Sequence, residues 1–400
     1  MNIYRPQKPY VFRPPKYSPV FAPALRCIAR LALKKNLNIR NIRVHGIERI
    51  VELARRGESM LIAPSHSDHA DPSVMVVTSA KHGLSFRYMA AREGFERHPA
   101  FAFVLQHLGA FSVDREGADL SAIKTAMQIL QKGESPLVIF PEGEIYHHHE
   151  QLGLLNEGVA TILLRSLGKI DEPRTCWLVP TAMRYLYDES ATETFSARLD
   201  RLEDRIGWKP RPELPVVDRI YRLGSGLLAL KEEEFLGFTQ SGSLVDRITA
   251  LRDRLIERVE QRHGIAGGDR TIPERVKAIR GRIRRQLLDE DKPPTADAMR
   301  LLQDDLDTVF VVLQLFSYPG RYVKELPTHH RIAETLLKLE EDVLGDGSYP
   351  APRDAVVRFG EPVDVRAFLR ERGLDAKSGV EPLTQFMAES IQRELEAARA

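Results

Sequence analysis

Short apolar runs alternate with helical patterns from Val44 to about Tyr187, and this alternation constrains the fold more than any other feature of the sequence. The apolar runs predict strands at Met60–Ala63, Phe86–Ala90, Ala110–Val113, Leu137–Phe140 and Cys176–Met183. The helices predicted between them include Pro72–Ala80, Pro99–Leu108, Leu120–Gln131 and Glu157–Ser166. Strands that alternate with helices indicate an α/β domain with a substantially parallel sheet.

The strand pattern is absent from about Thr192 to Leu344, where apolar residues recur at helical spacing. A strand is predicted again at Ala355–Phe359 and an amphipathic helix at Leu383–Ala398. We therefore expect an α/β domain with a substantially parallel sheet that carries a large all-helical insertion. The expected segments are a basic N-terminal arm and amphipathic helix at 1–40, the α/β domain at 41–190, the helical insertion at 191–348, and the return to the α/β domain at 349–400.

Composition excludes several classes of protein. Hydrophobic residues make up 43% and charged residues 28% of the 400 residues, which is typical of a globular and not of a disordered chain. No run approaches the ~20 apolar residues of a membrane-spanning helix, and the N-terminus lacks the continuous apolar region of a secretory signal. Two cysteines, Cys27 and Cys176, are too few for a disulfide framework. We expect a cytoplasmic protein.

Positive charge is concentrated in residues 1–44, which contain ten Lys and Arg residues and no Asp or Glu. Because the whole chain has a net charge of +2, the remaining residues carry −8. The helix predicted at Ala24–Lys35 separates two sets of residues: Leu25, Ile28, Ala29, Ala32 and Leu33 on one face, and Arg26, Arg30 and Lys34 on another. Such a helix either lies on anionic lipid or packs on its own domain with a solvated basic face. We expect residues 1–44 to bind an anionic membrane surface, so that the protein is peripheral on the membrane, and we expect no nucleic-acid partner.

A polar segment, SHSDHAD from Ser65 to Asp71, follows directly on the strand predicted at Met60–Ala63. Loops at the carboxyl ends of strands are where open α/β sheets place their sites. His66 and Asp71 fit a general base, in which the imidazole accepts a proton from a hydroxyl group and the carboxylate fixes its tautomer. Asp71 also precedes Pro72, so the alternative interpretation is that it caps the following helix.

A second motif consists of Gly109, Phe111 and Arg115, around and just after a predicted strand. The planar guanidinium of an arginine suits phosphate or carboxylate, although a surface arginine paired with Asp114 or Glu116 is the simpler interpretation. It ends, like the first motif, beyond the carboxyl end of its strand.

Two shorter motifs follow. The sequence FPEG at Phe140–Gly143 comes at the end of an apolar run, where it also fits an ordinary turn. Val179 and Pro180 lie inside a predicted strand, and proline there is typical of an edge or a bulge.

In this order and spacing, the four motifs resemble those of the phospholipid/glycerol acyltransferase family, which includes lysophosphatidic acid and glycerol-3-phosphate acyltransferases. The resemblance covers roughly residues 40–187 and leaves out the helical insertion. For the fold, it implies an α/β domain with a mixed sheet flanked by helices. It implies that His66 and Asp71 are catalytic and deprotonate an acceptor hydroxyl, which attacks an acyl thioester without an acyl-enzyme. It also implies acyl-CoA or acyl-carrier protein as donor, a lysophospholipid or glycerol-phosphate-type lipid acceptor, and no cofactor.

The same resemblance implies roles for the other motif residues. Arg115, with Gly109 and Phe111 in its motif, would hold the acceptor phosphate. Glu142 and Gly143 would orient the glycerol portion, and Val179 and Pro180 would shape the acyl path. Ser65 stands where the family usually has asparagine, and it retains the ability to form a hydrogen bond.

The chain departs from the family at two expected cations. Glu144 and Ile145 follow the FPEG motif in place of Thr-Arg, and Glu157 precedes a glycine where the family tends to have lysine. Two carboxylates would hold a doubly charged phosphomonoester less well, so a phosphodiester, zwitterionic or uncharged acceptor also fits.

Other interpretations of the polar residues are weaker. Three adjacent histidines, His147 to His149, point in different directions on a loop, and we expect no metal site because zinc needs three or four convergent ligands. A lipid hydrolase or thioesterase, with the same His/Asp pair activating water, is the alternative enzyme. A non-catalytic lipid-binding protein is the third candidate, and the intact motifs argue against it.

Overall fold

The computed structural model describes residues 10–117, 119–289 and 291–399, and these residues form two compact units. The sheet unit is built from Phe12–Asp114, Asp119–Ala191 and the segment that begins at Tyr349. The helical unit comprises Thr192–Ser348 together with the turn that begins at Arg115. Residues 1–9 of the predicted basic arm lie outside the described residues.

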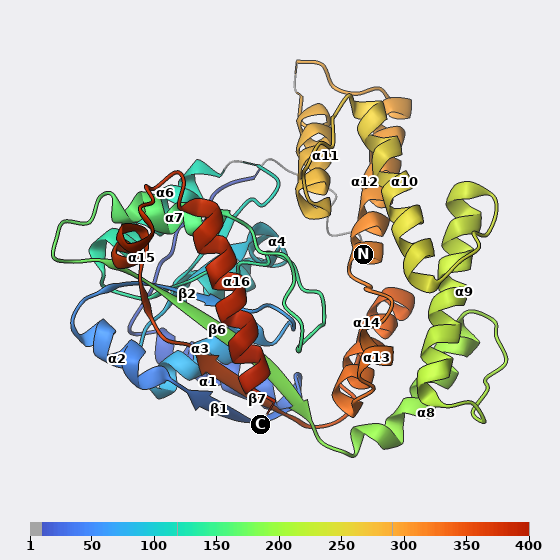
Figure 1. The fold of residues 1–400 in the computed structure, drawn as a ribbon, viewed down its shortest axis with the longest axis horizontal. Coiled ribbons are helices and arrows are strands. Elements are labelled where there is room, and N and C mark those ends of the chain that lie inside the picture. The colour runs from blue at the N-terminus through green and yellow to red at the C-terminus, as the bar shows by residue number, and fades with distance from the viewer. Residues whose placement is uncertain (1–9, 118, 290, 400) are drawn as a thin grey trace. The chain divides into compact units, whose positions relative to one another are not determined.

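The sheet unit contains an eight-stranded mixed sheet, as predicted (Figure 1). Its strands are β1 (Ile39–His45), β2 (Ser59–Pro64), β3 (Arg87–Ala91), β4 (Ala110–Val113), β5 (Leu137–Val138), β6 (Cys176–Tyr187), β7 (Arg353–Phe359) and β8 (Val363–Asp364). The spatial order is β1-β7-β6-β2-β5-β3-β4, and β8 pairs with β6 beside β7. Strands β2 to β6 are all parallel, whereas β7 and β8 run antiparallel to β6 and β1 runs parallel to β7.

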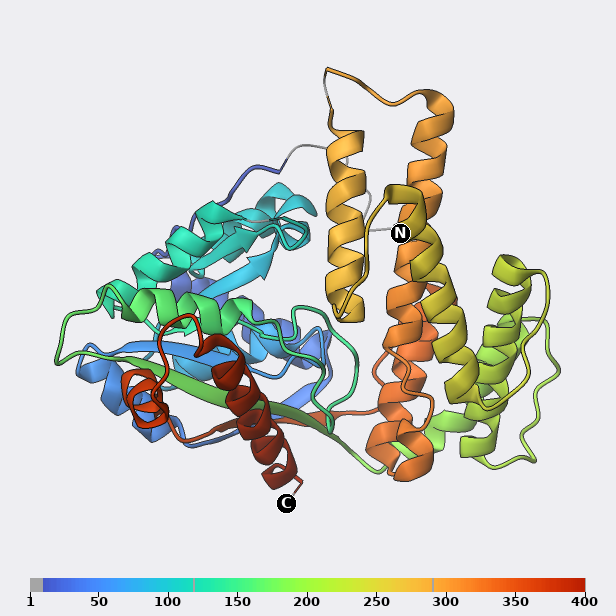
Figure 2. The ribbon, with the colours of Figure 1, turned by 45° about the horizontal axis from the view of Figure 1, so that its top comes forward.

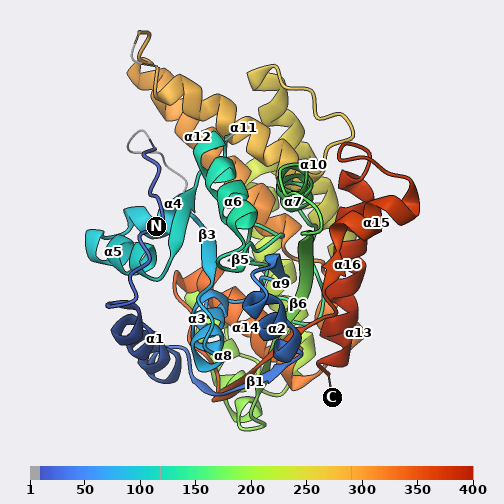
Figure 3. The same cartoon turned by 90° about the vertical axis from the view of Figure 1, so that its left-hand side faces the viewer.

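Helices cover both faces of this sheet (Figure 3). One face packs against α1 (Ala22–Lys35), α2 (Ile47–Arg55), α3 (Asp71–Lys81), α4 (Arg92–Glu96) and α5 (Pro99–His107). The other packs against α6 (Leu120–Lys132), α7 (Gly158–Leu167), α15 (Val365–Arg372) and α16 (Val380–Ala397). In β2, Met60 and Ile62 belong to the first layer, and Leu61 and Ala63 to the second. A strand buried on both faces has no polar alternation, which explains its continuous apolar sequence.

Pro180 corrects one expectation, because it lies neither at an edge nor in a bulge. It is inside β6, paired in register with Ala63 of β2. Its carbonyl accepts a hydrogen bond from the Gly360 amide (2.8 Å) on the other side, where the partner of β6 changes from β8 to β7. The N–H and C=O of a strand residue point to the same side, so an N–H of Pro180 would point toward the gap between β8 and β7. The absence of this N–H therefore removes no hydrogen bond between strands.

The helical unit consists of seven helices within the described residues: α8 (Ala191–Arg205), α9 (Val216–Leu236), α10 (Leu244–His263), α11 (Ile272–Leu287), α12 (Ala296–Phe316), α13 (Tyr322–Glu325) and α14 (His329–Leu344). Helices α10, α11 and α12 run side by side (Figure 2) around a core of their own, with Leu251, Ile279 and Val309 fully buried. The apolar spacing that predicted these helices is therefore the spacing of their buried faces.

No helix in the described parts of the chain has the length and apolar character needed to cross a bilayer.

Candidate active site

Two of the motifs lie next to each other because β2 and β5 are adjacent, parallel strands. Their carboxyl ends meet at one edge of the sheet, so the loop with His66 and the loop with Glu142 are neighbours. The ring of Phe140 stacks on the imidazole of His66, with centroids 4.2 Å apart and planes inclined by 28°. The Glu142 carboxylate accepts a hydrogen bond from the backbone amide of His66 (Oε1, 2.6 Å).

His66 and Asp71 form the hydrogen-bonded pair that the sequence predicts. The Nδ1 atom of His66 lies 2.9 Å from Oδ2 of Asp71. The Asp71 side chain is fully buried, whereas 15% of the His66 side chain is exposed. A carboxylate on Nδ1 selects the tautomer with a proton on that atom, which leaves Nε2 free to accept a proton.

Asp71 accepts hydrogen bonds from four directions. Besides His66, its Oδ2 receives the backbone amides of Ser67 (2.9 Å) and Asp68 (3.0 Å). Its Oδ1 receives the hydroxyl of Tyr185 on β6 at 2.6 Å. The N-cap residue of α3 is Ala70, without a side-chain cap. The two amides that donate to Asp71 belong to the loop before the helix and not to the first turn of α3. The carboxylate therefore holds the His66 loop in place. The interpretation of Asp71 as a helix cap is wrong.

Glu142 is a buried acid that joins three loops. Its second oxygen, Oε2, accepts the Gly153 amide at 2.8 Å, and the carbonyl of Glu142 accepts a hydrogen bond from the Asn156 side chain (3.1 Å). Burial raises the pKa of Glu142 to about 8, and the nearby Asp71 carboxylate adds to this shift. The side chain therefore acts on the shape of the site, through the backbone of His66.

A buried ion pair lies behind the His66 loop, and sequence reasoning missed it. Asp68 Oδ2 and Arg353 Nη1 on β7 are 2.6 Å apart, and neither side chain is exposed. Asp68 Oδ1 also accepts the backbone amide of Ala70 (2.8 Å), and the guanidinium of Arg353 lies 4.3 Å from the centroid of the Tyr185 ring. Burial alone would raise the pKa of Asp68, but Arg353 and His149 hold this pKa well below its usual range.

No local sequence signal links Asp68 with Arg353, because 285 residues separate them. Only the pairing of β7 with β6 brings them together. The one available hint was Asp68 itself, a further acidic residue in the polar loop that contains His66 and Asp71.

Ser65 and Val179 lie close to the pair and act through packing and backbone contacts. The Ser65 hydroxyl accepts the backbone amide of Met183 on β6 (2.9 Å), which ties the start of the loop to the neighbouring strand. Val179 is fully buried in the layer below the loop. Gly143 has φ = +73°, and a Cβ there would lie 2.9 Å from Asn156 Nδ2, so this turn requires glycine.

The second motif is not gathered around His66. Gly109, with φ = +93°, precedes β4, which is the last strand in the spatial order of the sheet, and Phe111 is buried in the core. Arg115 is half-buried in the turn after β4, which is separated from β2 by β5 and β3. Since neighbouring strands are ~4.8 Å apart, the ends of β4 and β2 are separated by roughly 14 Å. The phosphate-binding role of Arg115 stays a prediction.

The three adjacent histidines occupy different positions. His147 has a positive φ of 56° and its ring centroid lies 5.6 Å from that of His69. His149 is buried, with Nε2 3.7 Å from Asp68 Oδ2 and its ring 5.0 Å from that of Tyr185. His149 therefore belongs to the buried network behind the site.

Comparison with known proteins agrees with this geometry. Residues 41–184 match the model of a family described as Acyltransferase. This part of the chain is therefore similar to an acyltransferase domain. A stretch of 103 residues is also 30% identical to a 1-acyl-sn-glycerol-3-phosphate acyltransferase of Streptococcus pneumoniae (strain ATCC BAA-255 / R6). The match covers 26% of this chain and 37% of that relative, so it spans little more than a third of the relative's length. The predicted resemblance to phospholipid/glycerol acyltransferases is thereby confirmed.

Proposed function

We propose that the protein transfers a fatty acyl group from a thioester donor to a hydroxyl group of a lysophospholipid or glycerol-phosphate-type acceptor. The observation that carries this proposal is the pair formed by His66 Nδ1 and Asp71 Oδ2, 2.9 Å apart, at the carboxyl edge of the sheet in an acyltransferase domain. Acyl-CoA or acyl-carrier protein would serve as the donor, and the chemistry needs no cofactor.

In the proposed reaction, Nε2 of His66 takes the proton of the acceptor hydroxyl as its oxygen attacks the thioester carbonyl. An ester C–O bond forms, the C–S bond breaks, and the departing thiolate receives the proton from the imidazolium. Asp71 stabilises the imidazolium formed between these steps, while its four hydrogen bonds keep the carboxylate in place.

The acceptor would be recognised partly by Arg115. Strand β4, which Arg115 follows in the sequence, runs parallel to β3, β5 and β2, so its carboxyl end is on the same side of the sheet as theirs. We propose that this arginine binds an acceptor phosphate. Glu144 and Glu157 would disfavour a doubly charged phosphomonoester relative to the usual pattern of the family.

Membrane docking is the second part of the proposal, because the surface of α1 and α5 is apolar and basic together. Leu25 and Leu33 pack α1 onto its own unit, but Ile28 and Leu31 of this helix are 57% and 58% exposed. The exposed rings of Phe21 and Phe103 lie 5.7 Å apart, and Phe101 of α5 is exposed as well. The exposed basic residues of α1 are Arg30, Lys34 and Lys35. An anionic membrane matches both properties.

Mass spectrometry of lipids tests the reaction. Purified protein is incubated with an acyl-CoA and a panel of lysophospholipids, and both diacyl product and free fatty acid are measured. We expect acylated lipid that appears only when an acceptor is present. Release of free acid independent of acceptor would instead identify a hydrolase or thioesterase, and an unchanged lipid pool would contradict the proposal.

A further inference from the structure

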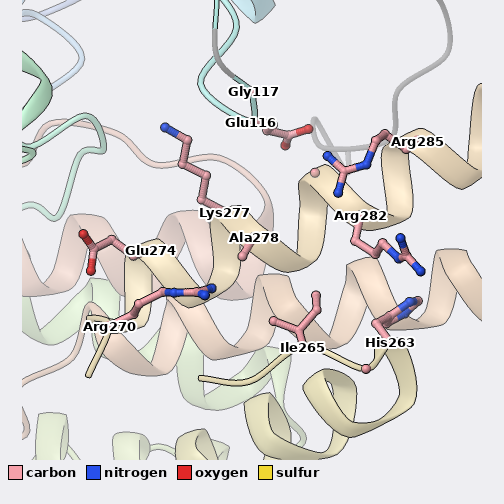
Figure 4. A pocket seen from close by; sticks show the side chains of 12 residues that line it. Glu116, Gly117, His263, Ile265, Arg270, Glu274, Lys277, Ala278, Arg282 and Arg285 are labelled. Atoms are coloured by element: carbon pink, nitrogen blue, oxygen red, sulfur yellow. The ribbon is translucent and has the colours of Figure 1, made fainter. Parts of the chain in front are cut away.

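The helical unit contains a hollow of about 650 Å³, and none of its lining residues belongs to the four sequence motifs. Its walls are one face of α11, the end of α10 with the loop that follows it, and the turn at Glu116 and Gly117 (Figure 4). All of these residues belong to the helical unit. A volume of this size lies within the range of small-molecule sites, which is roughly 300–1,000 Å³.

The wall formed by α11 is a regular helix face. Its lining residues recur at intervals of three and four: Glu274, Lys277, Ala278, Gly281, Arg282 and Arg285. The opposite face of the helix buries Val276, Ile279 and Ile283 in the core of the unit. The hollow is therefore lined by a helix whose rotation is fixed by packing.

Gly281 lets the turn approach this helix. A Cβ at position 281 would lie 2.9 Å from the backbone oxygen of Glu116, closer than a side chain tolerates. The Glu116 carboxylate also lies 4.0 Å from Nε of the buried Arg280. The turn is thus held against α11 and forms a defined wall.

Positive charge dominates the hollow. Arg270, Lys277, Arg282 and Arg285 line it, and Figure 4 shows the last three projecting from α11. Among the described residues, none of these four side chains has an ion-pair partner, whereas the carboxylate of Glu274 is engaged by Thr271 in the cap of α11. Four cations face two carboxylates, Glu116 and Glu274, so the lining has an excess of two positive charges. Such an excess concentrates anions of two or more charges.

The remaining lining residues complete a site with two kinds of surface. His263 is held in place by Asp305, 2.9 Å from its Nε2. Ile265 and Ala278 add an apolar area beside the cations. A phosphate group suits the arginine forks, and an organic group attached to it could cover the apolar area.

We propose that this hollow, the α10–α11 basic pocket, binds a ligand that carries two or more phosphate groups. A single inorganic ion would leave most of the volume empty and would engage few of the four cations. Nucleotides with more than one phosphate and multiply phosphorylated phospholipid headgroups share the required chemistry. The proposal does not depend on acyl transfer, because its test measures binding alone.

Calorimetric titration of the full-length protein tests the pocket with two probes. The first is adenosine 3′,5′-bisphosphate, which carries two phosphates on a soluble group, and the second is vesicles of phosphatidylcholine with a phosphatidylinositol bisphosphate added, a lipid whose headgroup also carries more than one phosphate. The pocket variant is Arg282→Glu/Arg285→Glu. The matched control is Arg205→Glu/Arg254→Glu, because these arginines are also exposed helical residues of the same unit, outside the pocket.

We expect the pocket variant to bind at least one of the probes about tenfold more weakly than the control, which should bind like the unchanged protein. A pocket-dependent loss with the bisphosphate identifies a soluble nucleotide-type ligand, and a loss confined to vesicles identifies a lipid headgroup. Equal weakening in both variants, or no binding of either probe to the unchanged protein, would overturn the proposal.

Discussion

At the residue scale, the proposed general base depends on a carboxylate whose hydrogen-bonding capacity is almost fully used. Asp71 binds His66, two backbone amides of the same loop and the hydroxyl of Tyr185. Burial and the neighbouring Asp71 raise the pKa of Tyr185 well above its usual value, so the phenol stays protonated and remains a donor. If His66 is the base, Tyr185 is a positioning residue, because it would act on the imidazole through Asp71.

Tyr185→Phe should therefore lower kcat. The substitution leaves a buried oxygen of Asp71 without its donor, which costs about 1–3 kcal/mol; if that cost falls on the transition state, kcat drops roughly 5- to 150-fold. The KM of the acceptor should stay the same, because the buried Tyr185 does not reach the surface of the site. Steady-state kinetics with Tyr88→Phe as a control, a buried tyrosine on β3, check this. Equal kcat values for the two variants would contradict the role of Tyr185.

Glu142 should make the folded state less stable as the pH rises. Burial raises its pKa to about 8, from about 4.3 in an unfolded chain. Between these values the folded state holds a proton that the unfolded state has lost, so the free energy of unfolding falls with increasing pH, by at most about 1.4 kcal/mol per pH unit. Urea unfolding at pH 5.5 and 8.0 should show a smaller fall for Glu142→Gln than for the exposed control Glu157→Gln. The same fall in both variants would show that Glu142 is ionised throughout.

The sequence was sufficient to predict the part of the site that lies within one loop. His66 and Asp71 are five residues apart, and they meet because the loop between them is short. The contact of Glu142 with the His66 backbone followed only in outline, from the position of both at strand ends. Tyr185 and the Asp68–Arg353 pair could not be predicted, because their positions depend on which strands are neighbours in the sheet.

At the element scale, α1 has apolar residues on two sides. The sequence analysis placed its apolar residues on a single, inner face. Leu25 and Leu33 are buried, as predicted for the inner face, but Ile28 was placed on that face and is instead exposed. Ile28 and Leu31 therefore stay available on the outside of the unit, beside basic residues.

Ile28→Ser/Leu31→Ser should weaken binding to anionic vesicles about tenfold or more, because each apolar side chain contributes roughly 1.5–3 kcal/mol when buried. Cosedimentation with vesicles that contain phosphatidylglycerol measures the effect. The control is Leu120→Ser/Leu230→Ser, two leucines that are 74% and 58% exposed elsewhere on the chain. Equal losses in both variants, or equal binding of the unchanged protein to neutral vesicles, would contradict docking through α1.

An element with a mixed pattern escaped prediction, and a very short one was predicted too long. β1 has one buried residue and six that are exposed or half-buried, so its sequence lacks an apolar run. β5 is two residues long, whereas the apolar run predicted a strand to Phe140; beyond Val138 the chain turns into the FPEG loop, and Phe140 packs on His66. Long buried elements such as β6 and α12 were predicted, since their pattern extends over many residues.

At the scale of the whole molecule, the chain leaves the sheet unit after β6 and re-enters it at β7. These two strands pair antiparallel, from Thr181 with Phe359 to Tyr187 with Arg353. A returning strand next to β6 places Arg353 beneath the His66 loop, so the C-terminal segment contributes to the site although it carries none of the four motifs. Hydrophobic periodicity predicted both strands but contains no information on their pairing.

The most direct test of the account is the rate of acyl transfer by His66→Ala, measured with acyl-CoA and the best lysophospholipid acceptor in protein whose circular dichroism matches the unchanged chain. A positioned general base contributes about 10²–10⁴-fold, so we predict a fall in kcat of that size. The remaining product should still be diacyl lipid and not free fatty acid. Turnover within a few-fold of the unchanged protein, in a folded His66→Ala variant, would contradict the role of the His66–Asp71 pair as the base.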